Sequence, residues 1–507
     1  MRSVQVGSLR RRWGVALTVA TLVSATVLAA GASAQASPPI NNGQPITGKP
    51  MAYHVQDPSY YWMTGSDGVN CSSQAMKFEP THYTVDGAPA VSTINYGVQN
   101  GAGYQIEVPA HWNGDLVLWA HGFNGNGNLL CVQKPNIDRA WYLAHGYAWA
   151  ASSYTDNGYD VVAGVKDTHA LIPLVTHTVA KPSHVYLTGE SMGGHIVGVS
   201  LEQYPNSYDA AMPVCGVLGD QQLFDYYYGA SAVAAALAGS GQALPFPTTN
   251  SGYTDFVRST SNMTIHGSTI ATSVPGLTPS TAYGAWATAV GNLTGGAARP
   301  GAVIAAYAYW NQFGFGPAPI NTLPFLLGVY PGTTSGTIGV AHGNVVDNTG
   351  TVYNTGDPSL NSYVNSTVKR ISADPSGSNN GLNGIPVIQG DPSVPVLTLH
   401  GTGDLFVPLS MEQIYAQRVA AHNQSNLLVQ RAIRNVGHCG FTQTELQAGF
   451  TSLVSWAKGG QKPAGDDVTT PAVLAAGTYG CQFTDPAATG TPTRSGAFFT
   501  TPCTTTH

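Results

Sequence analysis

The stretch that decides the fold is HVYLTGESMGGHIVGVSLEQY, residues 184–204. Its first part, residues 184–188, is a short apolar run with the composition of a buried strand. Residues 191–204 follow directly and have the apolar spacing of a helix. Between them lies the pentapeptide GESMG, in which two glycines allow a strand and a helix to approach closely around a tight turn. We therefore predict a strand–turn–helix unit with Ser191 at the turn.

The alternation of strands and helices continues on both sides of this unit. The predicted strands are residues 105–108, 115–120, 147–154, 210–215, 394–400 and 427–433. The predicted helices are residues 137–145, 165–179, 410–422 and 442–456. Short apolar strands that alternate with amphipathic helices are typical of a mostly parallel sheet covered on both faces. The chain is therefore predicted to be an α/β protein with one doubly wound, mostly parallel sheet.

The alternation stops between residues 217 and 391. This segment is rich in Gly, Ala, Thr, Ser and Asn, and it shows no regular strand–helix repeat. A structureless loop of this length is implausible inside a compact protein. We predict that residues 217–391 fold as a cap or lid. They would interrupt a core made of residues 35–216, which includes an N-terminal extension, and residues 392–457; residues 458–507 would form a C-terminal tail.

The N-terminus indicates export from the cell. Three arginines at positions 10–12 precede an apolar run over residues 15–30, and small residues follow at positions 32–34. This pattern predicts a cleavable signal peptide over residues 1–34. The mature protein is then expected outside the cell or in the periplasm. Only 9% of the residues are charged, which also suits a loop-rich extracellular protein.

Charge and hydropathy exclude several kinds of partner. The four arginines of residues 1–34 leave with that segment, so the mature chain carries a net charge of about −10. Such a charge argues against nucleic acid or an anionic membrane surface as a partner. No second apolar run is long enough to span a bilayer, so no stable membrane anchor is expected. The sequence leaves the oligomeric state open.

Six cysteines lie beyond the predicted signal peptide, at positions 71, 131, 215, 439, 481 and 503. An even number in an exported chain favours disulfides, although six cysteines allow fifteen pairings. None lies in a C-x-x-C pair, which argues against a zinc site. No metal or organic cofactor is implied. Cys481 and Cys503 are the expected local pair, which would close the tail.

A serine hydroxyl needs a base to accept its proton before it can attack a substrate. Asp404 follows a predicted strand, and a carboxylate on such a loop can orient an imidazole. His438 lies in NVGHCG, after the last predicted strand. We predict Ser191 as nucleophile, Asp404 as acid and His438 as base, in the chain order that this kind of fold requires. Asp391 competes as the acid, but it precedes its strand and so lies at the wrong end of the sheet.

A tetrahedral intermediate also requires hydrogen-bond donors for its oxyanion. One predicted donor is the backbone N–H of Met192, directly after Ser191. The second is the backbone N–H of Phe123, in the loop after the strand at residues 115–120. Two nearby histidines, His121 and His195, are expected to be structural rather than catalytic.

Four segments, which carry Ser191, Phe123, Asp404 and His438, together resemble the α/β-hydrolase superfamily of esterases, lipases and peptidases. The resemblance covers residues 105–215 and 394–456, and it implies the roles given above for the triad and the oxyanion donors. Tannase-like and feruloyl-esterase-like enzymes of this superfamily place a cysteine beside both the serine and the histidine and bridge them. Here Cys439 follows His438, but Glu190 precedes Ser191, so the pattern is half met. Cys215 is an alternative partner for Cys439.

The expected activity is hydrolysis of a carboxylic ester, from a small molecule or a polymer, by a secreted serine hydrolase that forms an acyl-serine intermediate. Aromatic clusters in the insertion would either line a pocket for an apolar or aromatic ester or form the core of the cap. They comprise Phe224 and Tyr226–Tyr228, then Tyr307, Tyr309, Trp310, Phe313 and Phe315.

Two other classes compete with the esterase. The first is an exported serine aminopeptidase of the same fold, which needs carboxylates near the site to bind the free ammonium group of its substrate. It is disfavoured because residues 217–391 contain no Glu and few Asp, such as Asp220 and Asp225. The second is a binding protein on an inactive scaffold, which is disfavoured because every triad position is filled.

Overall fold

A computed structural model of the chain divides it into two units, residues 1–38 and 39–507. The structure describes residues 46–47, 78–124, 129–241, 265–266, 269–303, 345–374, 378–379, 382 and 384–503. The predicted signal peptide and Cys71 lie outside these residues. None of the helices within the described ranges is long and apolar enough to cross a membrane.

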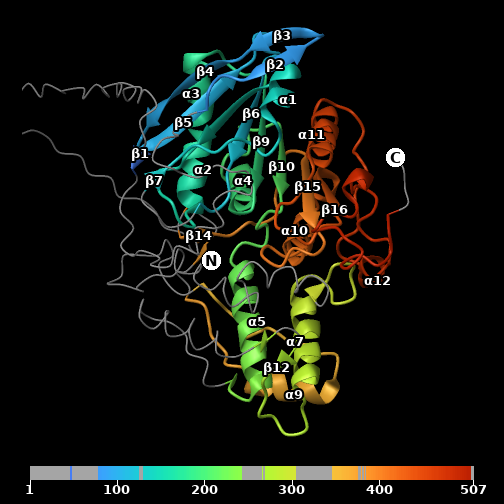
Figure 1. Ribbon diagram of the computed structural model, residues 1–507. Coiled ribbons are helices and arrows are strands. Elements are labelled where there is room, and N and C mark those ends of the chain that lie inside the picture. Colours follow the sequence, from blue (N-terminus) through green and yellow to red (C-terminus); the bar gives the residue numbers. More distant parts are fainter. Residues whose placement is uncertain are drawn as a thin grey trace, which may run out of the picture. The chain divides into compact units, whose positions relative to one another are not determined.

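An eight-stranded sheet forms the core of the second unit (Figure 1). Its strands are β4 (Thr93–Gln99), β5 (Ala102–Val108), β6 (Asp115–Ala120), β8 (Ala148–Ser152), β9 (His184–Glu190), β10 (Ala210–Val214), β15 (Val396–Gly401) and β16 (Leu428–Ile433). They lie in the order β16-β15-β10-β9-β6-β8-β5-β4. Neighbours from β8 to β16 pair in parallel, whereas β5 is antiparallel to both β8 and β4. The predicted mostly parallel sheet is therefore confirmed.

Helices cover both faces of the sheet. One face packs against α1 (Arg139–Ala144) and α11 (Gln443–Ala457), and the other against α2 (Val161–His169), α3 (Leu171–Thr178), α4 (Met192–Gln203) and α10 (Ser410–Ala421). The central strand β6 shows why both faces are apolar. Leu116 and Leu118 join one hydrophobic core, while Val117 and Trp119 join the other, because successive side chains of a strand point to opposite faces. The doubly wound arrangement follows from this two-sided burial.

Two predicted elements differ from the structure. Residues 165–179 were expected to form one helix, but α2 ends at His169 and α3 begins at Leu171. Pro173 accounts for the break, because its ring would clash with the carbonyl of residue 169 and it has no N–H to donate. Strand β4 was not predicted at all; its side chains are mostly half-buried and mixed in polarity, so it lacks the apolar pattern of the inner strands.

Short elements lie outside the main sheet. In the described part of the chain, four small sheets pair β1 (Ile46–Thr47) with β7 (Leu129–Leu130), β2 (His82–Val85) with β3 (Ala88–Val91), β11 (Ile265–His266) with β12 (Thr269–Ile270), and β13 (Ser378–Asn379) with β14 (Ile385–Pro386). The tail carries α12 (Pro471–Leu474) and a 3₁₀ turn at Pro486–Ala488, and another 3₁₀ turn, Ser425–Leu427, precedes β16.

Helices lie within the described part of residues 217–391. This part contains α5 (Gln222–Ala238), α7 (Pro279–Leu293) and α9 (Pro358–Thr367). Helices α5 and α7 pack together, and the indole N–H of Trp286 on α7 donates to the carbonyl of Ala230 on α5 at 3.1 Å. The first aromatic cluster lies on α5 and is buried, whereas the second lies outside the described residues. Folding of the whole segment as a cap stays a prediction.

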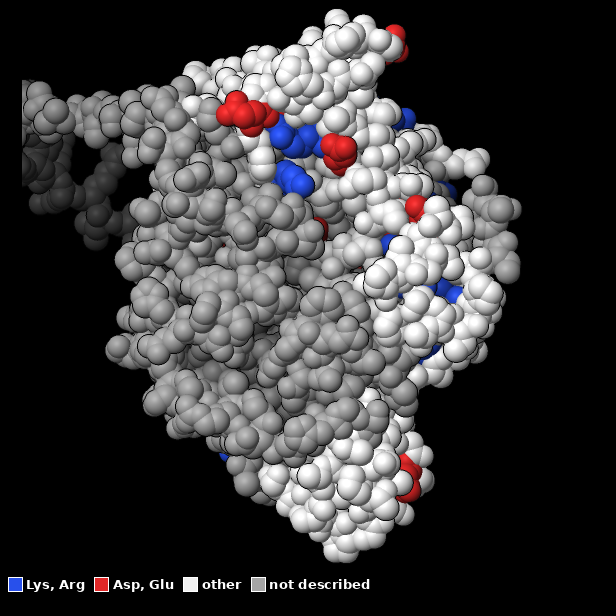
Figure 2. All heavy atoms as spheres, in the orientation of Figure 1, with Lys and Arg blue, Asp and Glu red and all other residues white. Residues whose placement is uncertain are grey.

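The described residues on one face of the molecule carry few charges. Figure 2 shows several Lys, Arg, Asp and Glu side chains side by side near the top of this face, and wide uncharged areas between most of the others. No broad basic patch is visible on the described part of this face.

Candidate active site

Ser191 lies at the turn between β9 and α4, where the sequence predicts it. Its backbone has φ 57° and ψ −121°, a conformation that residues with a side chain rarely adopt. The two flanking glycines are required by close packing. A Cβ atom at residue 189 would lie 2.5 Å from the carbonyl oxygen of Gly193, and one at residue 193 would collide with the backbone of Ala120. This geometry presents the Ser191 hydroxyl at the carboxyl end of β9.

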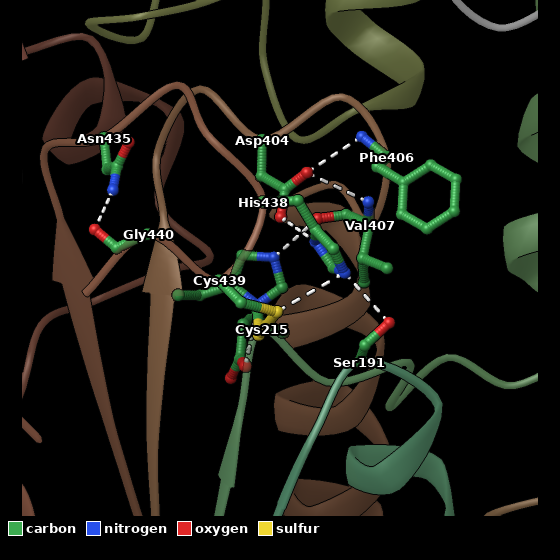
Figure 3. The surroundings of a disulfide bond; sticks show 11 residues. Ser191, Cys215, Asp404, Phe406, Val407, Asn435, His438, Cys439 and Gly440 are labelled. Atoms are coloured by element: carbon green, nitrogen blue, oxygen red, sulfur yellow. Dashed lines mark hydrogen bonds and ion pairs between the residues drawn. A yellow bond between two sulfur atoms is a disulfide. The ribbon is translucent and has the colours of Figure 1, made fainter. Parts of the chain in front are cut away.

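Three side chains from distant parts of the chain form a continuous hydrogen-bonded chain (Figure 3). His438 Nε2 lies 2.9 Å from Ser191 Oγ, and His438 Nδ1 lies 2.6 Å from Asp404 Oδ2. Because the carboxylate can only accept, Nδ1 carries the proton and Nε2 is free to accept from the serine hydroxyl. This is the tautomer with which a histidine can act as a base toward Ser191.

Asp404 is fully buried and both of its carboxylate oxygens are engaged. It follows β15, and its Oδ1 accepts the backbone N–H groups of Phe406 at 2.8 Å and Val407 at 3.1 Å. The other oxygen is therefore directed at His438. The competing acid Asp391 is exposed, precedes β15 and lies 3.9 Å from His422, away from this arrangement.

The loop that carries His438 is fixed by a disulfide. Cys439 is bonded to Cys215, with Cα atoms 5.3 Å apart. Cys215 directly follows β10, whose last residue Val214 pairs with Glu190 on β9. The bridging cysteine therefore comes from the strand beside Ser191 rather than from the position before it. Figure 3 shows this disulfide directly beneath the His438 ring.

The tail also contacts the histidine loop. Arg494 Nη2 donates to the carbonyl of Gly440 at 2.8 Å, and the same guanidinium forms an ion pair with Glu445. Cys481 and Cys503 form the predicted pair that closes the tail. Residues 458–503 thus pack against the loop that carries His438.

The loop after β6 contacts Ser191. A Cβ atom at residue 122 would lie 3.1 Å from Ser191 Cβ and 3.7 Å from its Oγ, so only glycine fits without displacement. Phe123 is the next residue, and Met192 begins α4 on the other side of Ser191. Both segments that carry the predicted oxyanion donors therefore adjoin Ser191. Their role as donors stays a prediction.

The two other histidines have structural environments. The His121 ring stacks on Tyr154 with centroids 3.9 Å apart, and its Nδ1 bonds the carbonyl of Gly122 at 2.7 Å. His195 is buried between the Tyr159 hydroxyl and the carbonyl of Pro386. Burial lowers the pKa of His195 to about 4, so this ring stays neutral at physiological pH.

Sequence reasoning missed the side chains that support Asp404 from the insertion. Tyr226 and Tyr227 were expected to line a pocket or to fill the cap core, but their hydroxyls donate to the backbone that follows Asp404. Arg299 also bonds this loop and was not singled out. No spacing in the sequence could have linked these residues to Asp404, because the contacts are tertiary.

One group of potential metal ligands is clustered within the described ranges. It comprises Cys215, His438 and Cys439, whose ligand atoms lie within 4.8 Å of one another. The two sulfurs are joined in the disulfide, so neither is available as a thiolate ligand.

Comparisons with known proteins give distant similarities. No family model matches the chain. Over 93 residues it is 31% identical to o-phthalyl amidase from Xanthobacter agilis, a match that covers 18% of this chain and 20% of the amidase. The chain thus spans about a fifth of the curated relative that it matches.

Solved structures are similar over longer stretches but at low identity. Feruloyl esterase B from Aspergillus oryzae aligns over 75% of this chain and 82% of its own, with 14% identity and a TM-score of 0.36. The rice cell wall degrading esterase LipA from Xanthomonas oryzae aligns over 74% and 86%, with 13% identity and a TM-score of 0.29.

The order and direction of the strands define the fold. Numbered along the chain, the eight strands of the sheet lie in the order 1-2-4-3-5-6-7-8, and only the second is antiparallel to the others. A sharp turn after the fifth strand carries the serine, and the aspartate and histidine follow the seventh and eighth strands. This is the α/β-hydrolase fold.

Proposed function

We propose that the protein is a serine hydrolase that cleaves carboxylic esters through an acyl-serine intermediate. The observation that best supports this proposal is the hydrogen-bonded chain from Ser191 through His438 to Asp404 at a strained strand–helix turn. This arrangement combines a nucleophile, a base of the correct tautomer and a carboxylate that orients the base.

The proposed reaction has two halves. Ser191 Oγ attacks the carbonyl carbon of the ester while His438 Nε2 accepts its proton. The tetrahedral intermediate collapses to the acyl-serine, and His438 donates the proton to the departing alcohol. A water molecule then attacks the acyl carbon with His438 again as base. The bond between Ser191 Oγ and the acyl carbon breaks, His438 returns the proton to Ser191 Oγ, and the carboxylic acid leaves. Asp404 accepts the hydrogen bond of His438 Nδ1 and stabilises the imidazolium.

Charge on the intermediate is stabilised by the backbone N–H groups of Met192 and Phe123. The close contact of Gly122 with Ser191 supports this assignment, because it brings the loop after β6 to the nucleophile. Loss of one such donor typically lowers turnover about a hundredfold or more. We further propose that no metal or organic cofactor takes part, so a chelator should leave the rate unchanged.

An ester is favoured over a peptide with a free amino terminus. An aminopeptidase needs a carboxylate near the site that can bind an ammonium group. The two candidates named from the sequence are otherwise occupied: Asp220 pairs with Arg418 at 2.5 Å, and Asp225 accepts the backbone N–H of Asp347 at 2.7 Å. We propose that the protein is exported, with residues 1–34 removed, and acts on a small-molecule or polymeric ester.

A substrate panel tests the proposal. Purified protein is assayed with p-nitrophenyl esters of rising chain length, an aryl ester and aminoacyl p-nitroanilides. The expected result is hydrolysis of esters alone, lost in Ser191→Ala with the circular dichroism spectrum unchanged. Hydrolysis of the anilides at comparable rates would favour the aminopeptidase instead.

A further inference from the structure

The loop on both sides of Asp404 receives three hydrogen bonds from side chains of the insertion. Tyr226 on α5 donates its hydroxyl to the carbonyl of Leu405 at 2.8 Å, and Tyr227 donates to the carbonyl of Phe406 at 2.6 Å. Arg299 Nε donates to the carbonyl of Thr402 at 2.7 Å. All three donors belong to residues 217–391, whereas the acceptors belong to the core.

We propose that Tyr226 and Tyr227, assisted by Arg299, are positioning residues that hold the carboxylate of Asp404 against His438. The insertion would then be part of the catalytic apparatus and not only a cover over the substrate. This inference rests on the proposed function.

Each tyrosine acts on Asp404 through a single peptide group. The carbonyl of Leu405 and the N–H of Phe406 belong to one peptide, so Tyr226 binds the oxygen of the group whose N–H donates to Asp404 Oδ1 at 2.8 Å. Tyr227 does the same through the next peptide, whose Val407 N–H donates to the same oxygen at 3.1 Å. A hydrogen bond to a peptide oxygen polarises the N–H at its other end and strengthens the bond that it donates.

Burial makes both tyrosines reliable donors. Their side chains are 3% and 0% exposed, so water does not compete for the two carbonyls. Burial, with the nearby Asp404 carboxylate, raises the pKa of both hydroxyls above the usual value, so both keep their protons. The ring of Tyr227 also lies near that of Phe406, with centroids 6.1 Å apart, and Phe406 packs edge-on against the His438 ring at 4.9 Å. Through Phe406, Tyr227 is therefore in indirect contact with His438 as well as with Asp404.

Arg299 adds a buried positive charge to the same loop. It is 3% exposed, and its other hydrogen bonds go to the carbonyls of Gly291 and Gly296 and to the Thr294 hydroxyl, all neutral groups. Burial lowers the pKa of Arg299 to about 10, so it stays charged at neutral pH. None of these partners neutralises the charge of Arg299, which therefore lies as a cation beside the loop that carries Asp404.

The neighbouring Tyr228 provides a matched control. It lies on the same helix and is equally buried, but its hydroxyl donates to the carbonyl of Lys369 at 3.4 Å. Lys369 belongs to the insertion, so Tyr228→Phe removes a buried hydroxyl from α5 without removing a bond to the Asp404 loop.

The test uses the full chain with Tyr226→Phe, Tyr227→Phe, the double variant, Tyr228→Phe, Asp404→Asn and Ser191→Ala. Two rates are measured: hydrolysis of a p-nitrophenyl ester, and inactivation by a fluorophosphonate, in which the serine oxygen bonds phosphorus and fluoride leaves. Each single tyrosine variant should lower kcat about three- to tenfold and the double variant about thirtyfold, with KM little changed. The acid limb of the pH–rate profile should move to lower pH in the double variant, because a histidine that loses its oriented carboxylate binds a proton less readily.

A double-mutant cycle with Asp404→Asn separates an effect on the position of Asp404 from an effect on the stability of the fold. In that background the two tyrosine substitutions should cost no further activity, because the group that they position is already impaired. Equal effects of the double variant in both backgrounds, or a double variant whose rates and pH profile match those of Tyr228→Phe, would overturn the inference. If the double variant does not fold, as judged by circular dichroism, the single variants in both backgrounds give the same decision.

The outcomes also separate this inference from the proposed function. Wild-type protein that reacts with the fluorophosphonate no faster than Ser191→Ala would overturn both. A reactive wild type with unchanged tyrosine variants would overturn only the positioning role.

Discussion

Removal of the Cys215–Cys439 disulfide should impair both stability and catalysis, because the bond joins the histidine loop to the strand beside the nucleophile. Cys439 is adjacent to His438, and Cys215 follows the residue that pairs with Glu190. The perturbation is the double variant Cys215→Ser/Cys439→Ser. The matched control is Cys481→Ser/Cys503→Ser, which opens the tail disulfide.

The two disulfides differ in the length of chain that they close. The first spans a sequence separation of 224 residues and the second a separation of 22. In the chain-entropy description, loops of these lengths correspond to about 5 kcal/mol and about 3 kcal/mol of folding free energy. Removal of the first bond should therefore lower the free energy of unfolding by about 2 kcal/mol more than removal of the second.

Urea unfolding at 15 °C measures both free energies, and the turnover of an ester is measured on the folded fraction of each variant. The first variant should lose at least about tenfold in kcat, since a misplacement of His438 by a fraction of an ångström weakens proton transfer. The control should keep its kcat within about twofold, because its bond joins two parts of the tail. A first variant that folds and retains full kcat would refute the view that this disulfide positions the base.

Three further predictions concern single residues. Gly122→Ala should lower kcat about tenfold or more, because its Cβ would press on Ser191, whereas Gly284→Ala, with open space around its Cβ, should leave kcat unchanged; an ester assay of both variants decides. Burial raises the pKa of Asp225 to about 8, so the folded state keeps a proton that the unfolded state loses above about pH 4, and stability falls with rising pH by up to about 1.4 kcal/mol per unit. Asp225→Asn should remove this slope in urea unfolding between pH 5 and 8, and an unchanged slope would contradict the assignment. Burial lowers the pKa of His400, but the carboxylate of Glu412 outweighs burial, and the pKa of the folded state lies above the usual value. The charged ring therefore stabilises the fold below about pH 6.5, and this stability is lost as pH rises through the folded-state pKa. His400→Gln should flatten the fall in unfolding free energy between pH 6 and 9, and a wild type that gains stability over this range would contradict the prediction.

The inner strands of the sheet and the places of Ser191, Asp404 and His438 after three of them could be predicted from the sequence, because both depend on local patterns. Inner strands such as β9 are short apolar runs, and the glycines around Ser191 allow the tight turn between β9 and α4. Asp404 and His438 each follow a strand, and parallel strands bring their carboxyl ends to one edge of the sheet. The local sequence around Ser191, Asp404 and His438 is therefore enough to place each of them at this edge of the sheet, without knowledge of their contacts.

The surroundings of the triad could not be predicted, because they depend on contacts between distant segments. The sequence left the partner of Cys439 open, with Cys215 as one alternative, and the register of β10 against β9 decides because it places Cys215 beside Ser191. The hydroxyls of Tyr226 and Tyr227 reach a loop 179 residues away in sequence. Nothing in their local pattern distinguishes a tyrosine that supports a loop from one that fills a core.

The account depends most on covalent catalysis by Ser191, and mass spectrometry of the enzyme during turnover tests it most directly. Enzyme mixed with a p-nitrophenyl ester is quenched with acid within milliseconds, digested and analysed for peptides that carry the acyl group. The account predicts an acyl adduct on Ser191, formed with a burst of p-nitrophenol and absent from Ser191→Ala. An adduct on another residue, or full turnover by Ser191→Ala, would contradict it.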